Sequence, residues 1–141
     1  MFQTSELTLV ELMDQNPSLF FQRSDAWWRN EPFAARKGEV RQLALRSGAV
    51  PNSCTKTRQG QQKLRGTGEF VPTARDVVEG MVASYRTGIR ILPDLYVRTS
   101  DTSSFGYRVG VGHFDADGLN ISGHWDDARS SILGLAGCRE A

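Results

Sequence analysis

The side chains best suited to chemistry lie close together in the last third of the chain. They are histidines, carboxylates, an amide and hydroxyls: His113, Asp115, Asp117, Asn120, Ser122, His124, Asp126, Asp127 and Ser130. Convergent oxygens bind hard cations, and imidazoles with a carboxylate bind zinc or transfer protons. The stretch therefore predicts either a metal site or a polar recognition surface.

The segment that begins at Asp115 is similar to the start of a calcium-binding loop but lacks its full pattern. The fifth position is Leu119, the sixth is Asn120 where a glycine is required, and no glutamate closes the loop at position twelve. A calcium site of another kind stays open, because five oxygen-bearing side chains could converge: Asp115, Asp117, Asn120, Asp126 and Asp127.

The spacing of the histidines gives little support to a transition-metal site. His113 and His124, taken with Asp126, show neither the H-x-H nor the H-x-x-x-H spacing of common ligand pairs. We therefore favour separate surface histidines. The alternative hypothesis is a calcium- or zinc-dependent binding protein or enzyme that uses the Asp/His cluster at 113–127.

No catalytic motif accompanies these residues. Cys54 and Cys138 are generic nucleophile candidates, and the sequence contains no G-x-S-x-G, G-x-x-x-x-G-K-[ST] or G-x-G-x-x-G. Four arginines predict structural ion pairs with the aspartates at 101, 126 and 127: Arg98, Arg108, Arg129 and Arg139. We expect no enzymatic activity and no cofactor.

Short strands must position the polar residues. Segments rich in β-branched and aromatic residues, bounded by Gly, Asp or Ser, predict strands at 95–101, 107–114, 119–122 and 133–139. Asp117-Gly118 predicts a tight reversal between the second and third of them. Strict alternation would place Val109, Val111 and His113 on one face of the sheet.

The upstream part supplies helices and one further strand. Apolar spacing predicts an amphipathic helix within 5–15 and a second one from the Thr73 cap to about Tyr85. A polar helix is expected over 56–64, capped by Asn52-Ser53. Residues 40–46 favour a strand, with a helix as the competing interpretation because Gln, Leu, Ala and Arg are good helix formers.

Four large aromatic residues bear on the choice between core and surface. Of the adjacent Trp27 and Trp28, one is expected in the core and the other half exposed. Phe114 and Trp125 could be binding hot spots, but we expect both in the core.

Length, charge and cysteine content narrow the class of protein. The 141 residues suit one domain, and two cysteines are too few for a disulfide scaffold. The net charge of +1 argues against nucleic-acid binding. The basic stretch at 56–65 does not change this, because it has no interleaved aromatic residues on which bases could stack. The N-terminus lacks a basic signal region and no apolar run approaches membrane-spanning length. We expect a soluble protein, cytoplasmic by default, with no nucleic-acid partner and no membrane insertion.

Motifs along nearly the whole chain resemble those of a family of small uncharacterised bacterial proteins. The matching segments are Trp27–Trp28, Leu45–Arg46, Val50–Ser53, Val71–Arg75, Tyr96–Asp101, Asp117–Leu119, Trp125–Asp127 and Leu133–Ala136. The last third is in turn similar to the variable proteins of diversity-generating retroelements. Those proteins carry a C-type-lectin-like fold related to that of formylglycine-generating enzyme.

The resemblance implies a specific α+β architecture. We expect a single C-type-lectin-like domain with two main helices and a short, twisted, mostly antiparallel sheet whose first and last strands pair. The domain would occupy residues 36–141, with a variable surface at 107–134, and residues 1–35 would form an N-terminal helical extension.

The resemblance also implies a function. In such proteins, mutagenesis directed at adenines rewrites chosen codons, mostly Asn codons, and so diversifies a ligand-binding surface. The corresponding positions here are Gly110, His113, Asp115, Asn120, Ser122, Gly123, His124, Ala128, Ser130, Ser131 and Ile132. Residues 82–139 contain no Lys, Glu, Gln or Met, which an Asn codon altered only at its adenines cannot encode. We expect a non-enzymatic binding protein whose ligand is a protein or another macromolecule.

Overall fold

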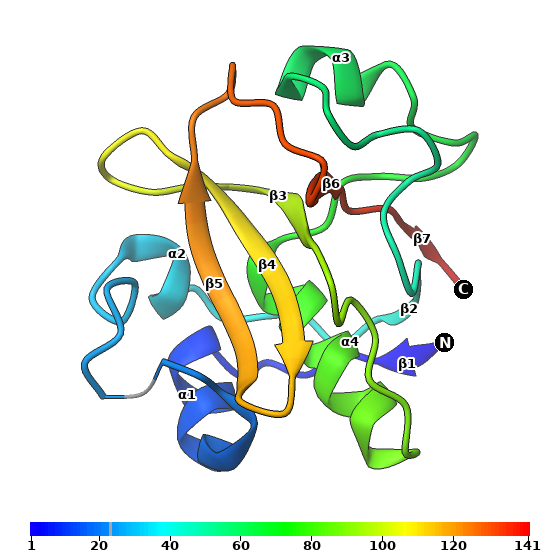
Figure 1. Ribbon diagram of the computed structural model, residues 1–141. Coiled ribbons are helices and arrows are strands. Elements are labelled where there is room, and N and C mark those ends of the chain that lie inside the picture. The colour runs from blue at the N-terminus through cyan, green and yellow to red at the C-terminus, as the bar shows by residue number, and fades with distance from the viewer. Residues whose placement is uncertain (23) are drawn as a thin grey trace.

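The computed structural model describes residues 1–22 and 24–141 and confirms a mixed α+β class (Figure 1). The helices in this part of the chain are α1 (Leu9–Gln15), the 3-10 helix η1 (Pro17–Leu19), α2 (Pro32–Ala35), α3 (Arg58–Gln62) and α4 (Ala74–Arg86). The strands are β1 (Phe2–Gln3), β2 (Gln42–Leu45), β3 (Tyr96–Thr102), β4 (Arg108–Asp115), β5 (Gly118–His124), β6 (Leu133–Leu135) and β7 (Cys138–Glu140).

Side-chain caps define where the two longest α-helices begin. The Thr73 hydroxyl accepts a hydrogen bond from the Asp76 backbone N–H at 3.2 Å, which confirms the predicted start of α4. At α1, Thr8 and Glu11 form a reciprocal capping box with bonds of 3.1 and 3.0 Å. The predicted N-terminal helix is therefore present but begins at Leu9.

The polar helix α3 is shorter than predicted and has a different cap. The Thr57 hydroxyl accepts from the Gly60 N–H at 3.2 Å, so Thr57 is the N-cap and the predicted Asn52-Ser53 cap is wrong. The Ser53 hydroxyl is instead buried and accepts from the Leu135 N–H at 3.0 Å. The Ser53 hydroxyl, which the local sequence pattern assigned to the helix cap, therefore takes part in a long-range hydrogen bond instead.

The strands form two sheets instead of the single sheet that was expected. One has the order β1-β2-β7 and the other β5-β4-β3-β6; all neighbours are antiparallel except β3 and β6. Strand β2 confirms the extended interpretation of residues 40–46.

The predicted closing strand at 133–139 is divided between the two sheets. Strand β6 pairs with β3 and β7 pairs with β2, with Ala136 and Gly137 between them. The Ala136 N–H donates to the Arg98 carbonyl, whereas the Gly137 carbonyl accepts from the Arg46 N–H, both at 3.0 Å. The chain therefore crosses from one sheet to the other at this point.

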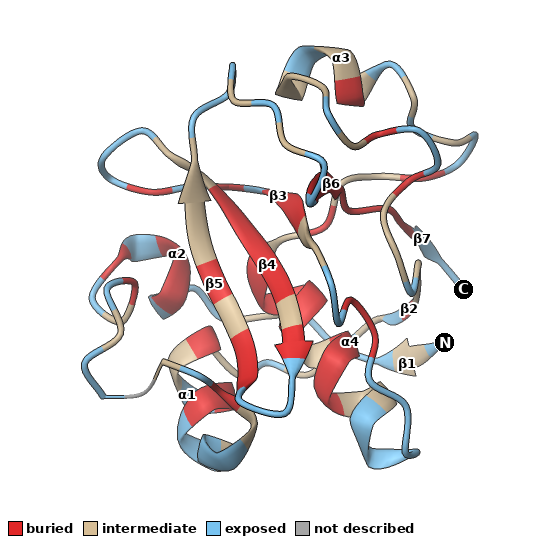
Figure 2. Cartoon of the chain, in the orientation of Figure 1, coloured by how far each residue is buried: buried red, intermediate tan, exposed pale blue. Residues whose placement is uncertain are grey.

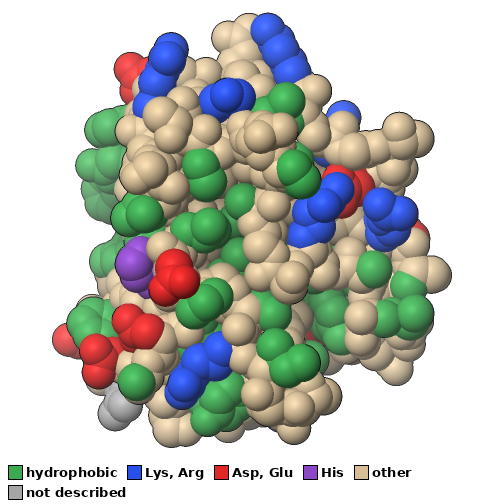
Figure 3. Space-filling model, turned by 45° about the vertical axis from the view of Figure 1, so that its right-hand side comes forward, with side chains coloured by type: hydrophobic (Ala, Val, Ile, Leu, Met, Phe, Trp, Pro, Cys, Tyr) green, Lys and Arg blue, Asp and Glu red, His purple; other side chains and the backbone are tan. Residues whose placement is uncertain are grey.

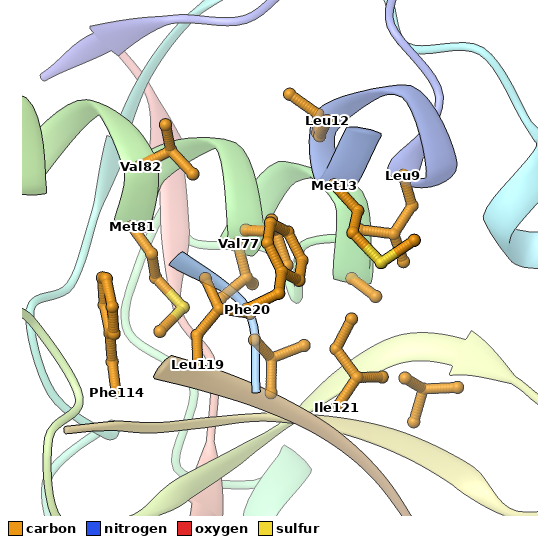
Figure 4. Packing of buried hydrophobic residues seen from close by; sticks show 14 of the residues in the cluster. Leu9, Leu12, Met13, Phe20, Val77, Met81, Val82, Phe114, Leu119 and Ile121 are labelled. Atoms are coloured by element: carbon orange, nitrogen blue, oxygen red, sulfur yellow. The ribbon is translucent and has the colours of Figure 1, made fainter. Parts of the chain in front are cut away.

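The core lies between helices α1 and α4 and the inner face of the four-stranded sheet (Figures 2 and 4). From the helical side come Leu9, Val77 and Met81, and from the sheet come Leu119 and Ile121, all fully buried. Burial of each such side chain contributes about 1.5–3 kcal/mol. Residues of the predicted N-terminal extension and of the predicted domain therefore share one hydrophobic core.

The large aromatic residues divide between core and surface. Trp28 is fully buried and Trp27 is 39% exposed, as predicted for the pair. Phe114 is buried as expected, but Trp125 is 53% exposed, so its predicted core position is wrong. Trp125 follows the last residue of β5 and stacks on Tyr107, with ring centroids 4.2 Å apart.

A bulge in β4 overturns the predicted side of His113. The pairing of β4 with β5 shifts register between Gly112 and Asp115, and His113 has a φ of 50°. Phe114 therefore takes the inward position after Val111, and its N–H donates to the Leu92 carbonyl at 3.0 Å. His113 does not follow Val111 into the core.

None of the helices in the described part of the chain combines the length and the apolar character needed to cross a bilayer.

Candidate binding surface

Most of the sequence-predicted residues of β4 and β5 lie on the outer face of the four-stranded sheet, but Gly123 pairs with the buried Val109 and so lies on the inner side. Val111 and Ile121 are paired and point into the core, so their neighbours along each strand point outward. Gly110 pairs with Ser122 on this outer face. Tyr96 of β3 lies opposite Gly112 in the register, on the same face, and was not among the predicted site residues.

Tyr96 is the centre of this surface. Its ring centroid lies 4.7 Å from that of His113 and 5.6 Å from that of His124. Its N–H donates to the Ile132 carbonyl at 2.7 Å, which brings the segment after β5 beside it. Burial, followed by the nearby Asp115 carboxylate, raises the pKa of Tyr96. The sequence signal for a close contact here was Gly112, because a Cβ at that position would meet the backbone of Leu95 and Tyr96.

Ser122 and His124 form a hydrogen-bonded pair on β5. The Ser122 Oγ lies 2.7 Å from the His124 Nε2, and the imidazole covers Gly110, where an added Cβ would meet the ring at 2.8 Å. Burial, and then the charge of Arg98, lowers the pKa of His124, so the imidazole is neutral near pH 7. No carboxylate of the described residues binds its other nitrogen, so the orienting third member of a catalytic triad is not seen there.

The remaining predicted residues differ in exposure. Asp115, Ser131 and Ile132 are exposed, and Asn120, Gly123, Ala128 and Ser130 are partly buried. The Asp115 carboxylate accepts from the Asp117 N–H at 2.9 Å, so it stabilises the hairpin turn. The surface therefore has a semi-buried aromatic centre with an adaptable polar rim.

The carboxylates do not converge as a metal site requires. Asp115 and Asp117 lie at one end of β5, while Asp126 and Asp127 follow its other end. Within residues 1–22 and 24–141, no three His, Cys, Asp or Glu side chains are grouped closely enough to hold a metal ion. The geometry gives no support to the metal-dependent alternative.

Arg98 lies directly beneath the segment that borders Tyr96. The side chain is fully buried, and its Nη1 donates to the Lys56 carbonyl at 3.1 Å and to the Gln61 Oε1 at 2.9 Å. Its Nη2 donates to the carbonyls of Trp125 at 2.9 Å and Ala128 at 2.7 Å. Its Nε has no hydrogen-bond partner among the described residues. One guanidinium thus ties β3 to α3 and to the segment after β5.

Gln61 extends this network. Its amide nitrogen donates to the Ser53 carbonyl at 2.9 Å and to the Leu133 carbonyl at 3.1 Å, while its oxygen accepts from Arg98. Burial, the largest influence, lowers the pKa of Arg98 despite the opposing charge of Asp126. The network thus joins backbone carbonyls of four segments through two buried side chains.

The arginine ion pairs differ from the prediction. Arg98 hydrogen-bonds to carbonyls and an amide instead of to a carboxylate. Arg108 lies 3.5 Å from Asp126, as expected, but Asp101 pairs with Arg36 at 3.1 Å. Arginines therefore hold loops in place as expected, but Arg98 does so through hydrogen bonds to backbone carbonyls.

The site is an open, polar and aromatic sheet face. No family model, curated protein or solved structure matches the chain.

We predict that Arg98→Lys destabilises the protein by about 2–4 kcal/mol, because an ammonium group cannot serve four acceptors in the planar arrangement of a guanidinium. Urea denaturation measures the change. The exposed Arg139→Lys is the matched control, expected to stay within about 0.5 kcal/mol of the parent. Equal stability of the two variants would show that the Arg98 network is not needed.

We predict that protonation of His124 weakens the fold. Because its folded pKa lies below the ordinary histidine value of about 6.5, the unfolded chain binds the proton first as pH falls. The free energy of unfolding should decrease from about pH 6.5 downward until the folded imidazole also titrates. NMR titration of the imidazole, with His124→Asn as the control for the pH-dependent stability, tests this. A measured pKa above 6.5 would contradict it.

Proposed function

We propose that the protein is a non-enzymatic binding module that presents the outer face of β3, β4 and β5, together with residues 125–132, to a macromolecular ligand. The observation that carries this proposal is the Tyr96 surface itself: stacked, partly exposed rings held over a buried, hydrogen-bonded framework. Rigid aromatic anchors with adaptable polar neighbours bind partners at low entropic cost.

We further propose that the scaffold is of the C-type-lectin-like type. Support comes from the antiparallel pairing of β2 with β7, which joins the early strand of the predicted domain to its closing strand. The placement of α3 and α4 between β2 and the β3–β5 meander agrees with the same arrangement.

The geometry of this surface narrows the set of positions that diversification could change. A side chain at Gly110 would meet the His124 ring at 2.8 Å, and one at Gly123 would meet the Tyr107 Cβ at 2.9 Å. We therefore assign these two glycines to the framework. The exposed Asp115, Ser131 and Ile132 are the positions best able to vary without loss of the fold.

We predict that a library randomised at Asp115, Asn120, Ser131 and Ile132 retains cooperative thermal unfolding in most members, because these side chains lie outside the core. Display selection on a panel of biotinylated test proteins should yield binders. The matched library varies exposed positions of α1 and η1, on the other side of the sheet: Asp14, Gln15 and Ser18. Loss of folding in the first library, or no more binders than in the second, would contradict the proposal.

We predict a near-copy of the 3′ end of the coding sequence in the flanking DNA, differing at adenines and accompanied by a reverse-transcriptase gene. Sequencing of the flanks checks this, and gene copies should differ at the exposed positions but not at Gly110 or Arg98. Differences spread evenly over the gene, with no such copy nearby, would remove the retroelement part of the proposal and leave the binding part standing.

A further inference from the structure

A row of exposed aromatic side chains follows the outer edge of β5, the edge strand of the four-stranded sheet. Phe21 donates its N–H to the Leu119 carbonyl at 2.9 Å, and the Trp27 indole N–H donates to the Ile121 carbonyl at 2.9 Å. Trp125 continues the row just past the strand. Their exposed fractions are 59%, 39% and 53%. These three residues define the aromatic row.

The two tryptophans of the row are held in place. The Trp27 ring packs on Phe33 at a centroid distance of 6.2 Å in addition to its indole bond, and Trp125 stacks on Tyr107 at 4.2 Å. Single exposed apolar residues are common on protein surfaces and need no explanation. Several fixed aromatics in register with one strand form a preorganised contact surface, of the kind that supplies hot spots.

Exposed carboxylates lie at both ends of the row. Asp115 and Asp117 belong to the hairpin beside Gly118, which contacts Phe21, and Asp126 and Asp127 follow Trp125. The exposed Asp25 lies between Phe21 and Trp27 in the chain. In Figure 3, hydrophobic side chains extend down the left-hand edge of the molecule, with acidic side chains near the upper and lower ends.

Only part of this negative charge is balanced by described neighbours. Asp126 lies 3.5 Å from Arg108, whose side chain is 13% exposed, and the exposed Arg129 lies beyond the row. Trp125, Gly106 and the carboxylates of Asp126 and Asp127 together line a shallow depression. An aromatic wall beside carboxylates attracts an ammonium or guanidinium group through both the ring face and the charge.

We propose that the aromatic row docks an extended, basic segment of a partner protein. Apolar side chains of that segment cover Phe21, Trp27 and Trp125, and Lys or Arg side chains at its ends meet the two carboxylate pairs. The seven residues of β5, at about 3.3 Å each, match an occupant of about seven to nine extended residues. The row shares residues 125–127 with the surface of the proposed function, so the inference rests in part on that proposal, whereas Phe21 and Trp27 lie outside that surface.

A fluorescein-labelled peptide, Arg-Arg-Leu-Ser-Leu-Ser-Leu-Arg-Arg, tests the proposal by fluorescence anisotropy. Binding should weaken about tenfold or more in Trp125→Ala, as for an interface hot spot, and also in Asp126→Asn/Asp127→Asn. It should weaken as salt increases, because exposed charges are screened. A peptide with Glu in place of each Arg should not bind. Thermal melting of each variant confirms that it is folded.

Two matched controls separate this site from the rest of the surface. Ile89→Ala removes an equally exposed apolar side chain away from β5, and Ile132→Ala alters the Tyr96 surface. Both should bind the basic peptide like the parent, and failure of the library experiment above would leave this result unaffected.

Several results would overturn the proposal. They are no binding of the basic peptide, binding that Trp125→Ala leaves unchanged, self-association that Trp125→Ala abolishes, or Trp125-dependent binding to phosphatidylglycerol vesicles.

Discussion

The buried guanidinium of Arg98 is the constraint on which the recognition face depends. A cation taken fully out of water is costly unless donors and acceptors are matched around it. Here the matching groups are three backbone carbonyls and the Gln61 amide oxygen, and no carboxylate takes part. Because these acceptors come from the turn before α3, from α3 itself and from the segment after β5, burial of one side chain fixes three parts of the chain relative to β3.

That fixation determines what the surface can do. With the carbonyls of Trp125 and Ala128 held from below, the segment that ends at Ile132 is held against Tyr96. The stacked rings of His113, Tyr96 and His124 then need little further ordering when a ligand arrives. The Gly110 position provides the space in which the His124 ring lies. Under the proposed function, recognition uses this sheet face, and variation is confined to the exposed positions at its edge.

Local patterns predicted much of the fold. The Thr73 cap and the strands near 96–102 and 108–115 depend on neighbours in sequence, and the structure contains them. The predicted reversal is also present, but its two turn residues are Ala116 and Asp117, because Gly118 already pairs with Asp115 as the first residue of β5. The predictions that were wrong concern residues whose partners lie far away in the sequence. The Ser53 hydroxyl accepts a hydrogen bond from the Leu135 N–H instead of capping a helix. The bulge turned His113 outward, and Arg98 found carbonyl partners from segments that the sequence does not show to be close. Tyr96 was missed because its importance comes from strand register.

We expect the Arg98 network to make residues 125–132 a rigid part of the proposed binding surface, although they lie outside regular structure. Backbone ¹⁵N relaxation of the native protein tests it most directly. Order parameters for this segment should approach those of β3 and β4, about 0.85, because the Arg98 network holds it. Values below about 0.6 for the segment, with rigid neighbouring strands, would contradict the account.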